Sequence, residues 1–435
     1  MRITFHIQEL GRLKDTSFDL HPFLIFTGDS NLGKSYCAFL VYGFLKSLET
    51  ELFTDFIGKI VNLETTIEKL KKGEKIDVKF YLKDIEIFFN ENAQAILGSL
   101  IGYEEVNCKV SLKFQELEDI TITTIYDEFH NSYLVATHER TWTISQNTKA
   151  VTDTVFWRSC LGNLIKIYLL KKLDSQREFS FNNTFIFPPA RGSILSFPYT
   201  MQKAVSSNMR MYSKFLTDMD KLREPSFGKK AINKEVLTKL KEIMAGEIKI
   251  RQNEIHYQFD NQSIPLTAAA SSIKELAPLF LLLKKEEPNE ISLLFEEPES
   301  HLHPAMQKKL ADLLAYMVNK GAFLQITTHS SYFLTEWNNL LRLHFIREKS
   351  QECFETALAE THIPADCVLS PEKVGAYYFH VRQDGSVELR KSEITEQSQI
   401  QFDTFNDTVT ELNENRYILM EKLAELTEKE HEREN

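Results

Sequence analysis

The chain has 435 residues, of which 43% are hydrophobic and 26% charged, as expected for a folded globular protein of two or three domains. The formal net charge of −11 argues against a protein that coats nucleic acid through bulk charge, although it leaves room for a local basic groove. The five cysteines are scattered, no apolar run approaches the length of a membrane span, and the N-terminus lacks the pattern of a signal peptide. We therefore expect a cytoplasmic protein with reduced thiols and no membrane partner.

The first 51 residues predict three short strands followed by a loop and a helix. Residues 3–7 and 16–20 are strand-like, and residues 23–26 form a continuous apolar run that is typical of a buried strand. Residues 34–51 then carry apolar side chains at helical spacing, which suits burial against a sheet.

The segment between this strand and this helix has the pattern Gly-x-x-x-x-Gly-Lys-Ser of a phosphate-binding loop. Its residues are Gly28, Asp29, Ser30, Asn31, Leu32, Gly33, Lys34 and Ser35. The glycines let successive N–H groups point at the phosphates of ATP, Lys34 is expected to reach the terminal phosphates, and Ser35 is expected to bind Mg²⁺. The alternative, a glycine turn with a surface lysine, is disfavoured by the flanking strand and helix.

The middle of the chain changes character several times. Residues 52–105 are predicted to be helical and amphipathic, and residues 106–147 alternate at period two, as in an antiparallel sheet. Residues 152–173 return to a helical pattern. Residues 198–250 predict a polar helical lobe, and they contain no sustained heptad pattern.

Arg191 follows a predicted strand at residues 185–187. Ligands of open α/β sheets gather at the carboxyl ends of strands, so Arg191 is a candidate contact for a phosphate or a partner. An arginine in a structural turn explains the same pattern equally well.

A helix is predicted to begin near Ser271 and Ser272, after strand-like residues 246–266. Either serine suits an N-cap, and Glu275 completes a capping-box pattern with Ser272. A helix start that is rich in serine and small residues can also bind an anion.

Two carboxylates, Glu296 and Glu297, end a buried apolar run at residues 291–295. Glu296 is expected to hold Mg²⁺ and Glu297 to orient and deprotonate a water molecule, the arrangement known as Walker B. An exposed acidic turn is the alternative. His329 ends the next predicted strand, residues 322–328, and could contact the γ-phosphate, although a lone histidine is often structural.

His301 and His303 resemble a metal pair, but the missing third ligand and the helix start at Pro304 favour a turn that packs at a dimer interface. Further along, residues 341–346 look like one more strand. Residues 374–390 look like a hairpin, and the tail from residue 402 looks helical.

The order of these motifs resembles that of the ABC-type ATPases, and the string from Glu296 to Pro304 resembles the OLD-like and SMC-like branch found in bacterial antiphage defence systems. The resemblance implies an ABC-type ATPase head of α/β class, with a mixed or parallel core sheet, an antiparallel β region and a helical side lobe. The implied segments are 1–51 and 251–350 for the two halves of the core, 52–180 for an insertion, 181–197 for a core strand and the Arg191 loop, 198–250 for the lobe, and 351–435 for a hairpin and tail.

In that family two heads dimerise head to tail around ATP and Mg²⁺. The resemblance implies that Ser271 and Ser272 touch the γ-phosphate held by the other copy, that Glu297 is the general base and that His329 is the switch histidine. Two departures are Ile273, where the signature motif has glycine, and Glu296, where many relatives have aspartate.

The chain also lacks the Asp-x-Asp pair of a Toprim nuclease after His329. The resemblance therefore implies a slow ATPase that forms a dimer or larger homo-oligomer and controls a separately encoded effector, such as a nuclease. An SMC-like ATPase that repairs DNA or processes DNA ends is the alternative.

Overall fold

The computed structural model of the chain describes most of its residues, and the fold is discussed for these alone. They are residues 2–61, 65, 66, 68, 69, 72, 74–127, 132–136, 141–145, 154–174, 177, 183–197, 201–202, 210–224, 234–252, 254–401 and 403–434.

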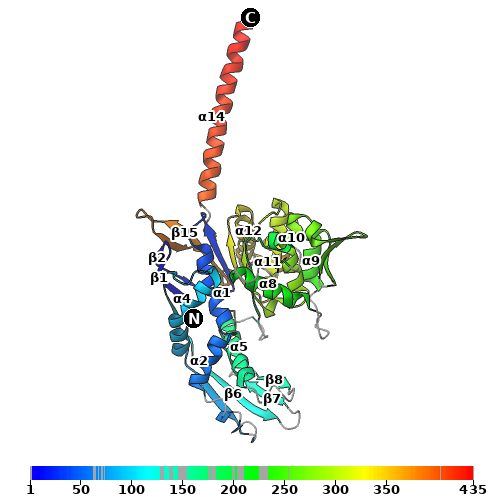
Figure 1. Cartoon of the computed structure of the whole chain (residues 1–435). Helices are drawn as coiled ribbons and strands as arrows, with labels where there is room; N and C mark the ends of the chain where they lie inside the picture. The colour runs from blue at the N-terminus through cyan, green and yellow to red at the C-terminus, as the bar shows by residue number, and fades with distance from the viewer. Residues whose placement is uncertain are drawn as a thin grey trace.

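A nine-stranded mixed sheet forms the centre of the molecule, in the order β5-β1-β2-β16-β15-β3-β14-β13-β9 (Figure 1). Its strands are β1 (Arg2–Leu10), β2 (Leu13–Asp19), β3 (Phe23–Gly28), β5 (Cys108–Gln115), β9 (Asn183–Phe187), β13 (Ile291–Glu296), β14 (Phe323–Thr328), β15 (Val374–Val381) and β16 (Val387–Lys391). The run β15-β3-β14-β13-β9 is parallel throughout. The α/β class and the mixed core sheet that the sequence predicts are confirmed.

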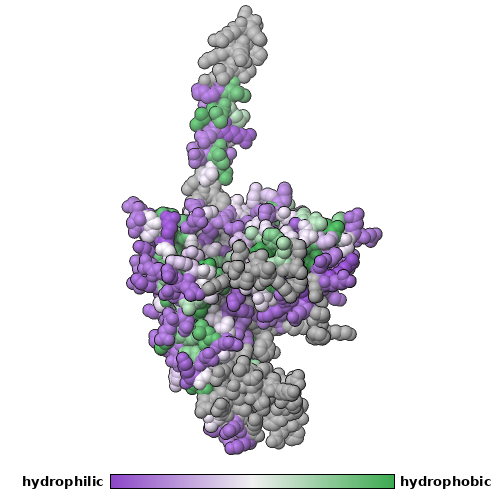
Figure 2. All heavy atoms as spheres, in the orientation of Figure 1, coloured by the Kyte–Doolittle hydropathy of each residue, from purple (hydrophilic) through white to green (hydrophobic). Residues whose placement is uncertain are grey.

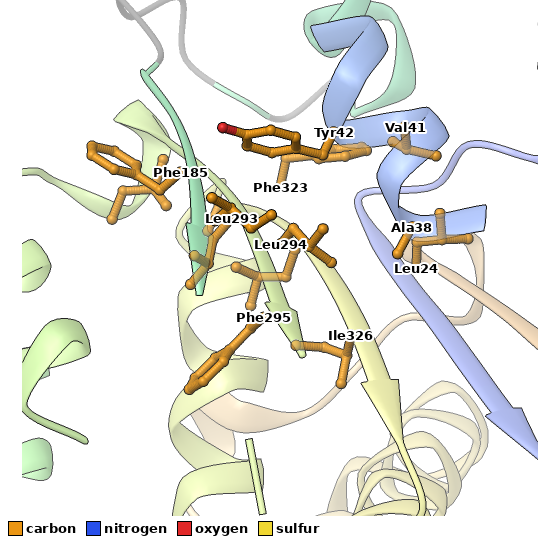
Figure 3. Close-up of a cluster of buried hydrophobic side chains, with 14 of the residues drawn as sticks. Leu24, Ala38, Val41, Tyr42, Phe185, Leu293, Leu294, Phe295, Phe323 and Ile326 are labelled. Atoms are coloured by element: carbon orange, nitrogen blue, oxygen red, sulfur yellow. The ribbon is translucent and has the colours of Figure 1, made fainter. Parts of the chain in front are cut away.

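Helices cover both faces of this sheet. The helices with described bounds are α1 (Lys34–Ser47), α2 (Glu51–Ile60), α4 (Leu82–Ile101), α5 (Thr154–Leu173), α6 (Arg191–Leu195), α8 (Arg210–Arg223), α9 (Lys234–Met244), α10 (Ser271–Leu283), α11 (Pro304–Asn319), α12 (Ser331–Lys349), α13 (Gln351–Thr361) and α14 (Asp403–Glu434), the last of which lies away from the sheet. Figure 3 shows Ala38 and Tyr42 of α1 packed over apolar side chains of the parallel strands. On the opposite face the ring of Trp337 from α12 lies 4.9 Å from that of Phe23.

Two smaller antiparallel sheets complete the described fold. The first contains β4 (Ile76–Phe80), β6 (Ile120–Asp127), β7 (Ser132–Ala136) and β8 (Thr141–Ser145), and the second contains β10 (Glu247–Arg251), β11 (Glu254–Phe259) and β12 (Gln262–Pro265). The predicted antiparallel region is therefore present, except that β5 pairs with β1 in the central sheet.

Two predictions of secondary structure are wrong. Residues 341–346 form no strand, because they continue helix α12, whose N-cap Ser330 accepts a hydrogen bond from the N–H of Phe333. Residues 76–80 are not helical, because their alternating Ile76, Val78 and Phe80 belong to strand β4, which pairs with β6. The hairpin at 374–390 and the helical tail from 402 are confirmed. The division into six segments stays a prediction, to which the structure adds that β5, β15 and β16 join the central sheet.

Candidate functional site

The glycine loop between β3 and α1 adopts a conformation that only glycine supports at both ends. Gly28 has φ of 129°, and a Cβ there would lie 3.1 Å from the carbonyl oxygen of Phe379 in β15. Gly33 has φ of 99°, and a Cβ there would lie 2.9 Å from Leu13. Larger side chains would strain the backbone or push the neighbouring strands away. The glycines of the pattern therefore fix how the loop sits on the sheet.

Lys34 is held inside this loop. Its Nζ donates to the carbonyl of Gly28 at 3.0 Å and to that of Asp29 at 2.6 Å. Burial lowers the pKa of Lys34 to about 8, against the opposing effect of nearby carboxylates that begins with Glu297. A phosphate beside this ammonium would favour its charged form, so the residue suits an anion site.

Ser35 joins the loop to the end of β13. Its hydroxyl donates to Oε2 of Glu296, a residue 261 positions later in the chain. Glu296 is only 2% exposed, burial raises its pKa to about 7, and its Oε1 has no hydrogen-bond partner in the protein. A buried carboxylate with one free oxygen beside a serine hydroxyl offers the hard oxygen ligands that Mg²⁺ prefers. These residues therefore fit the predicted metal site.

Glu297 turns out of the strand toward the loop. Its φ is 43°, and its N–H donates to the carbonyl of Thr327 at 2.9 Å. This hydrogen bond connects the turn after β13 to β14. Its side chain lines a pocket of about 520 Å³ together with Lys34 and His329. The structure thus brings together the lysine, the second carboxylate and the histidine that the sequence singles out.

His329 follows β14 directly. Its N–H donates to Oε1 of Glu299 at 2.7 Å, and the hydroxyl of Thr328 donates to the same oxygen at 2.7 Å. The ring is half-buried, and its pKa is lowered first by burial and then by the positive charge of Lys34. Glu299 was not assigned a role from the sequence. The signal available in the sequence was that Glu299 is the third glutamate between Glu296 and Pro304. Its hydrogen bonds fix the position of His329.

The rest of the pocket is lined by residues that the sequence analysis did not select. These are Leu10, Gly11 and Arg12 at the β1–β2 turn, Tyr36 in the first turn of α1, and Thr327 near the end of β14. They flank the glycine loop, and they add the apolar Leu10, the cationic Arg12 and the aromatic Tyr36 to the lining of the pocket. Leu10, Gly11 and Arg12 carry no local pattern, because they reach the pocket only through the pairing of β1 with β2. Tyr36, by contrast, directly follows Ser35 of the loop in the chain.

Ser271 and Ser272 do not line this pocket. They begin α10, but neither is its N-cap: Ala270 occupies that position, and no side chain caps the helix. The predicted capping box is therefore wrong. Glu275 lies elsewhere because its Oε1 accepts the N–H of Gly192 at 3.2 Å.

Arg191 connects α10 with the end of β13. Fully buried, it donates to the carbonyls of Glu275 at 3.1 Å and Glu296 at 2.8 Å, while its Nε lies 3.2 Å from Oε2 of Glu275. The guanidinium also lies over the ring of Phe295, 4.4 Å from its centroid. With these contacts, Arg191 belongs to the core and faces no open site, so the interpretation as a structural residue fits better than that as a phosphate contact.

One of the two histidines before α11, His303, has a structural explanation. His303 is the N-cap of α11, and its Nδ1 accepts the N–H of Ala305 at 3.3 Å. Among the residues that the structure describes, no group of three His, Cys, Asp or Glu side chains is arranged to hold a metal ion. In the described helices, no stretch is both long and apolar enough to cross a membrane.

Comparisons with known proteins give a family match and a set of distant structural likenesses. An SMC head domain bound to the C-winged-helix domain of ScpA is 10% identical, with 91% of this chain and 98% of that chain covered and a TM-score of 0.37. The SMC head domain from Thermotoga maritima is 11% identical, covers 91% and 100% of the two chains, and has a TM-score of 0.34. An Smc head domain with an extended coiled coil, bound to the C-terminal domain of ScpA derived from Pyrococcus furiosus, is 10% identical, with 95% and 98% covered and a TM-score of 0.36. TM-scores below 0.5 add no argument of their own.

None of the curated proteins matches the chain. The family model of the AAA ATPase domain matches residues 1–334, which include the glycine loop, Glu296, Glu297 and His329. The chain therefore belongs to the AAA ATPase domain family.

Proposed function

We propose that the protein binds ATP with Mg²⁺ in this pocket and hydrolyses it to ADP and phosphate. The single observation that carries the proposal is the bond between Ser35 and Glu296, which joins the glycine loop to the acidic strand end. Lys34, Glu297 and His329 surround one pocket beside that bond. Such a combination of anion-binding loop, free carboxylate oxygen and second carboxylate is what transfer of a phosphoryl group to water requires.

Each residue has one role in the proposed reaction. The loop N–H groups and Lys34 bind the phosphates, while Ser35 and Glu296 would hold the metal, which offsets charge on the phosphate oxygens when it is bound. Glu297 takes a proton from water as the water oxygen bonds to the γ-phosphorus and the bond to the β-phosphate oxygen breaks. His329, fixed by Glu299, donates to the γ-phosphate.

A second copy of the chain is proposed to complete the site. Ser271 is exposed at the uncapped start of α10, and it lies outside the pocket of its own chain. A phosphate presented by another copy would accept the free N–H groups and the hydroxyl there. We therefore propose a head-to-tail dimer in which α10 of one copy meets the γ-phosphate bound to the other.

The test is the variant Glu297→Gln. We expect ATP hydrolysis to fall by about 10²–10³-fold, because the substituted amide cannot take the proton of the water. ATP binding should be retained, and light scattering should detect a dimer that persists in ATP. Phosphate release and mass in solution are measured on the same sample.

Glu290→Gln is the matched control, since Glu290 lies at the other end of β13 and should leave turnover unchanged. Wild-type hydrolysis by Glu297→Gln would disprove the assignment of the base. A wild-type protein that releases no phosphate at all would overturn the proposed activity.

A role in antiphage defence, as the sensor or regulator of a separately encoded effector, is proposed from the resemblance of the motifs. Its test is co-purification of the native protein with the product of the neighbouring gene, followed by assay of that product for toxicity or nuclease activity. Recovery of a homodimer alone would count against it. Turnover stimulated by DNA, with binding that weakens steeply with salt, would instead favour the SMC-like alternative.

A further inference from the structure

Helix α14 leaves the body of the protein and projects away from it (Figure 1). Every side chain described from residue 408 to residue 424 is exposed. Several of these are large and apolar: Val409 is 55% exposed, Leu412 62%, Leu419 68% and Met420 57%. Green apolar patches are visible along the projecting helix in Figure 2. An exposed apolar stripe of this kind on a long helix indicates an interaction surface.

The spacing of the stripe is that of a coiled coil. Leu412 and Leu419 occupy d positions of a heptad, and Val409 and Arg416 occupy the a positions between them. The sequence continues the same register at both ends, with Phe405 and Leu426 at d and Leu423 at a. A pattern of 3.5 residues sustained over three heptads is a seam for another helix, whereas a helix that packs on a globular core has a broader apolar face.

A shallow groove lies along this seam, with a volume of about 430 Å³. Its lining residues are Leu412, Asn415, Arg416, Leu419, Met420 and Leu423, which are the a, d, e and g positions of the register. The surface that a second helix would fill therefore coincides with the positions that the heptad assigns to it.

The distribution of charge favours a second copy of the same helix. Glu411, Glu414 and Glu421 fall at c and f positions, which face away from the seam, and no glutamate stands at an e or g position between Thr408 and Lys422. Two copies of an acidic chain can meet along this face without opposing carboxylates.

The side chains at a and d also indicate the orientation. A β-branched residue at a with leucine at d favours two parallel strands, and one polar residue at an a position fixes the register at some expense of stability. Val409, Leu412 and Arg416 follow this rule. In a parallel pair, Arg416 lies beside the g-position Asn415 of the other copy, whose amide oxygen can accept from the guanidinium.

We infer that α14 forms a parallel two-stranded coiled coil with α14 of a second copy, and that this contact needs no nucleotide. It goes beyond the proposed function, because it would hold two copies together before ATP joins their heads. Two heads tethered in this way meet at a high effective concentration, up to the millimolar range for a short flexible connection. ATP turnover would then depend little on protein concentration.

The test uses the full chain without nucleotide, in sedimentation and light scattering over a range of concentrations. We expect the wild type to be dimeric, and Leu419→Asp to weaken the dimer at least tenfold. Ile418→Asp is the matched control: Ile418 is 55% exposed one residue away at a c position, so the same substitution should leave the dimer intact. Far-UV circular dichroism and ATP binding should stay unchanged in both variants, since neither touches the core.

Orientation is tested by disulfide formation in a Cys353→Ser background, which removes the exposed native thiol. Leu412→Cys and Leu419→Cys should each give a covalent homodimer under mild oxidation, because equal d positions face each other only in a parallel pair. Glu414→Cys, at f, should give none. A wild type that is monomeric without nucleotide, equal loss of dimer in Ile418→Asp, or cross-linking by Glu414→Cys as fast as by Leu419→Cys would each overturn the inference. None of these outcomes would alter the expected behaviour of Glu297→Gln in hydrolysis.

Discussion

Helices α1 and α10 both begin without a side-chain cap, yet their N-termini have different surroundings. The start of α1 follows Gly33 and lies against the pocket, with Lys34 only 6% exposed. The start of α10 follows Ala270, and its first residue Ser271 is exposed and outside that pocket. One N-terminus is thus built into the proposed anion site of its own chain, whereas the other presents N–H groups without a side-chain cap to the surroundings.

The difference indicates that the starts of α1 and α10 have separate roles in the proposed site, which two copies of the chain share. The loop before α1 has Glu296, Glu297 and His329 around it, so we expect it to hold the nucleotide in the proposed reaction. The start of α10 has no such neighbours, but the helix is held in the core through Glu275, four residues after Ser271. Arg191 binds the carbonyl of Glu275 on α10 and that of Glu296 on β13, and so connects the two helix starts through the core.

The largest expected effect comes from breaking the contact between Arg191 and Glu275. Glu275→Ala leaves the buried guanidinium of Arg191 without its carboxylate, which should lower the free energy of unfolding by about 3–5 kcal/mol. Urea denaturation measures the change. Glu254→Ala is the control, because that glutamate is exposed and should shift the midpoint little. Equal stability of the two variants would show that Arg191 is held by its carbonyl contacts alone.

The next largest effect is expected from removal of Lys34 from the proposed anion site at the start of α1. Lys34→Ala should reduce ATP hydrolysis by about 10²–10³-fold, because the ammonium that stabilises charge on the terminal phosphates is removed. Binding of a fluorescent ATP analogue and phosphate release are the measurements. The exposed Lys75→Ala should behave as the wild type. Unchanged turnover in Lys34→Ala would mean that the nucleotide lies elsewhere.

A smaller effect is expected at the start of α10. Ser271→Tyr places a bulky ring at the proposed contact, so turnover should fall about tenfold through loss of productive pairing, equivalent to about 1.4 kcal/mol. Each copy should still bind nucleotide. Gln351→Tyr, at the exposed first position of α13, controls for bulk at a helix start.

A mixture of the Ser271→Tyr and Lys34→Ala variants tests whether α10 of one copy acts on the site of the other copy. A mixed dimer contains one site in which both halves are intact, so the mixture should recover part of the turnover that each variant lacks. Failure of the mixture to exceed the sum of its components would argue that α10 does not act on the other copy.

The parts of the site that could be predicted are those encoded within short segments. The strand, loop and helix from Phe23 to Ser47 lie in one stretch, and the acidic pair directly follows its own buried strand. The meeting of Ser35 with Glu296 followed from the resemblance of the motifs. Arg12 was missed, because a residue that enters a pocket through strand pairing carries no local signal in the sequence. Tyr36 was missed although it directly follows Ser35 in the chain.

The predicted secondary structure was wrong where a strand periodicity and a helical periodicity both fit the same residues. Leu341, Leu343 and Phe345 alternate as in a strand, but Phe333, Trp337 and Leu341 follow the helical period and are buried in α12. The helix forms, because burial of one face over nineteen residues stabilises a helix more than a short alternation stabilises a strand. The neighbours of β3 in the sheet were not predictable in this way, since β15 lies some 350 residues later in the chain.

The position of β3 between β14 and β15 has a consequence for how the protein is made. Gly28 lies against Phe379, so the backbone next to the glycine loop is supplied by a strand some 350 residues later in the chain. During translation the loop emerges early, but both edges of its strand stay open until residues 323–328 and 374–381 have left the ribosome. The sheet beside the loop is therefore completed only after residue 381 has emerged, and until then the nascent chain exposes strand edges that chaperones can shield.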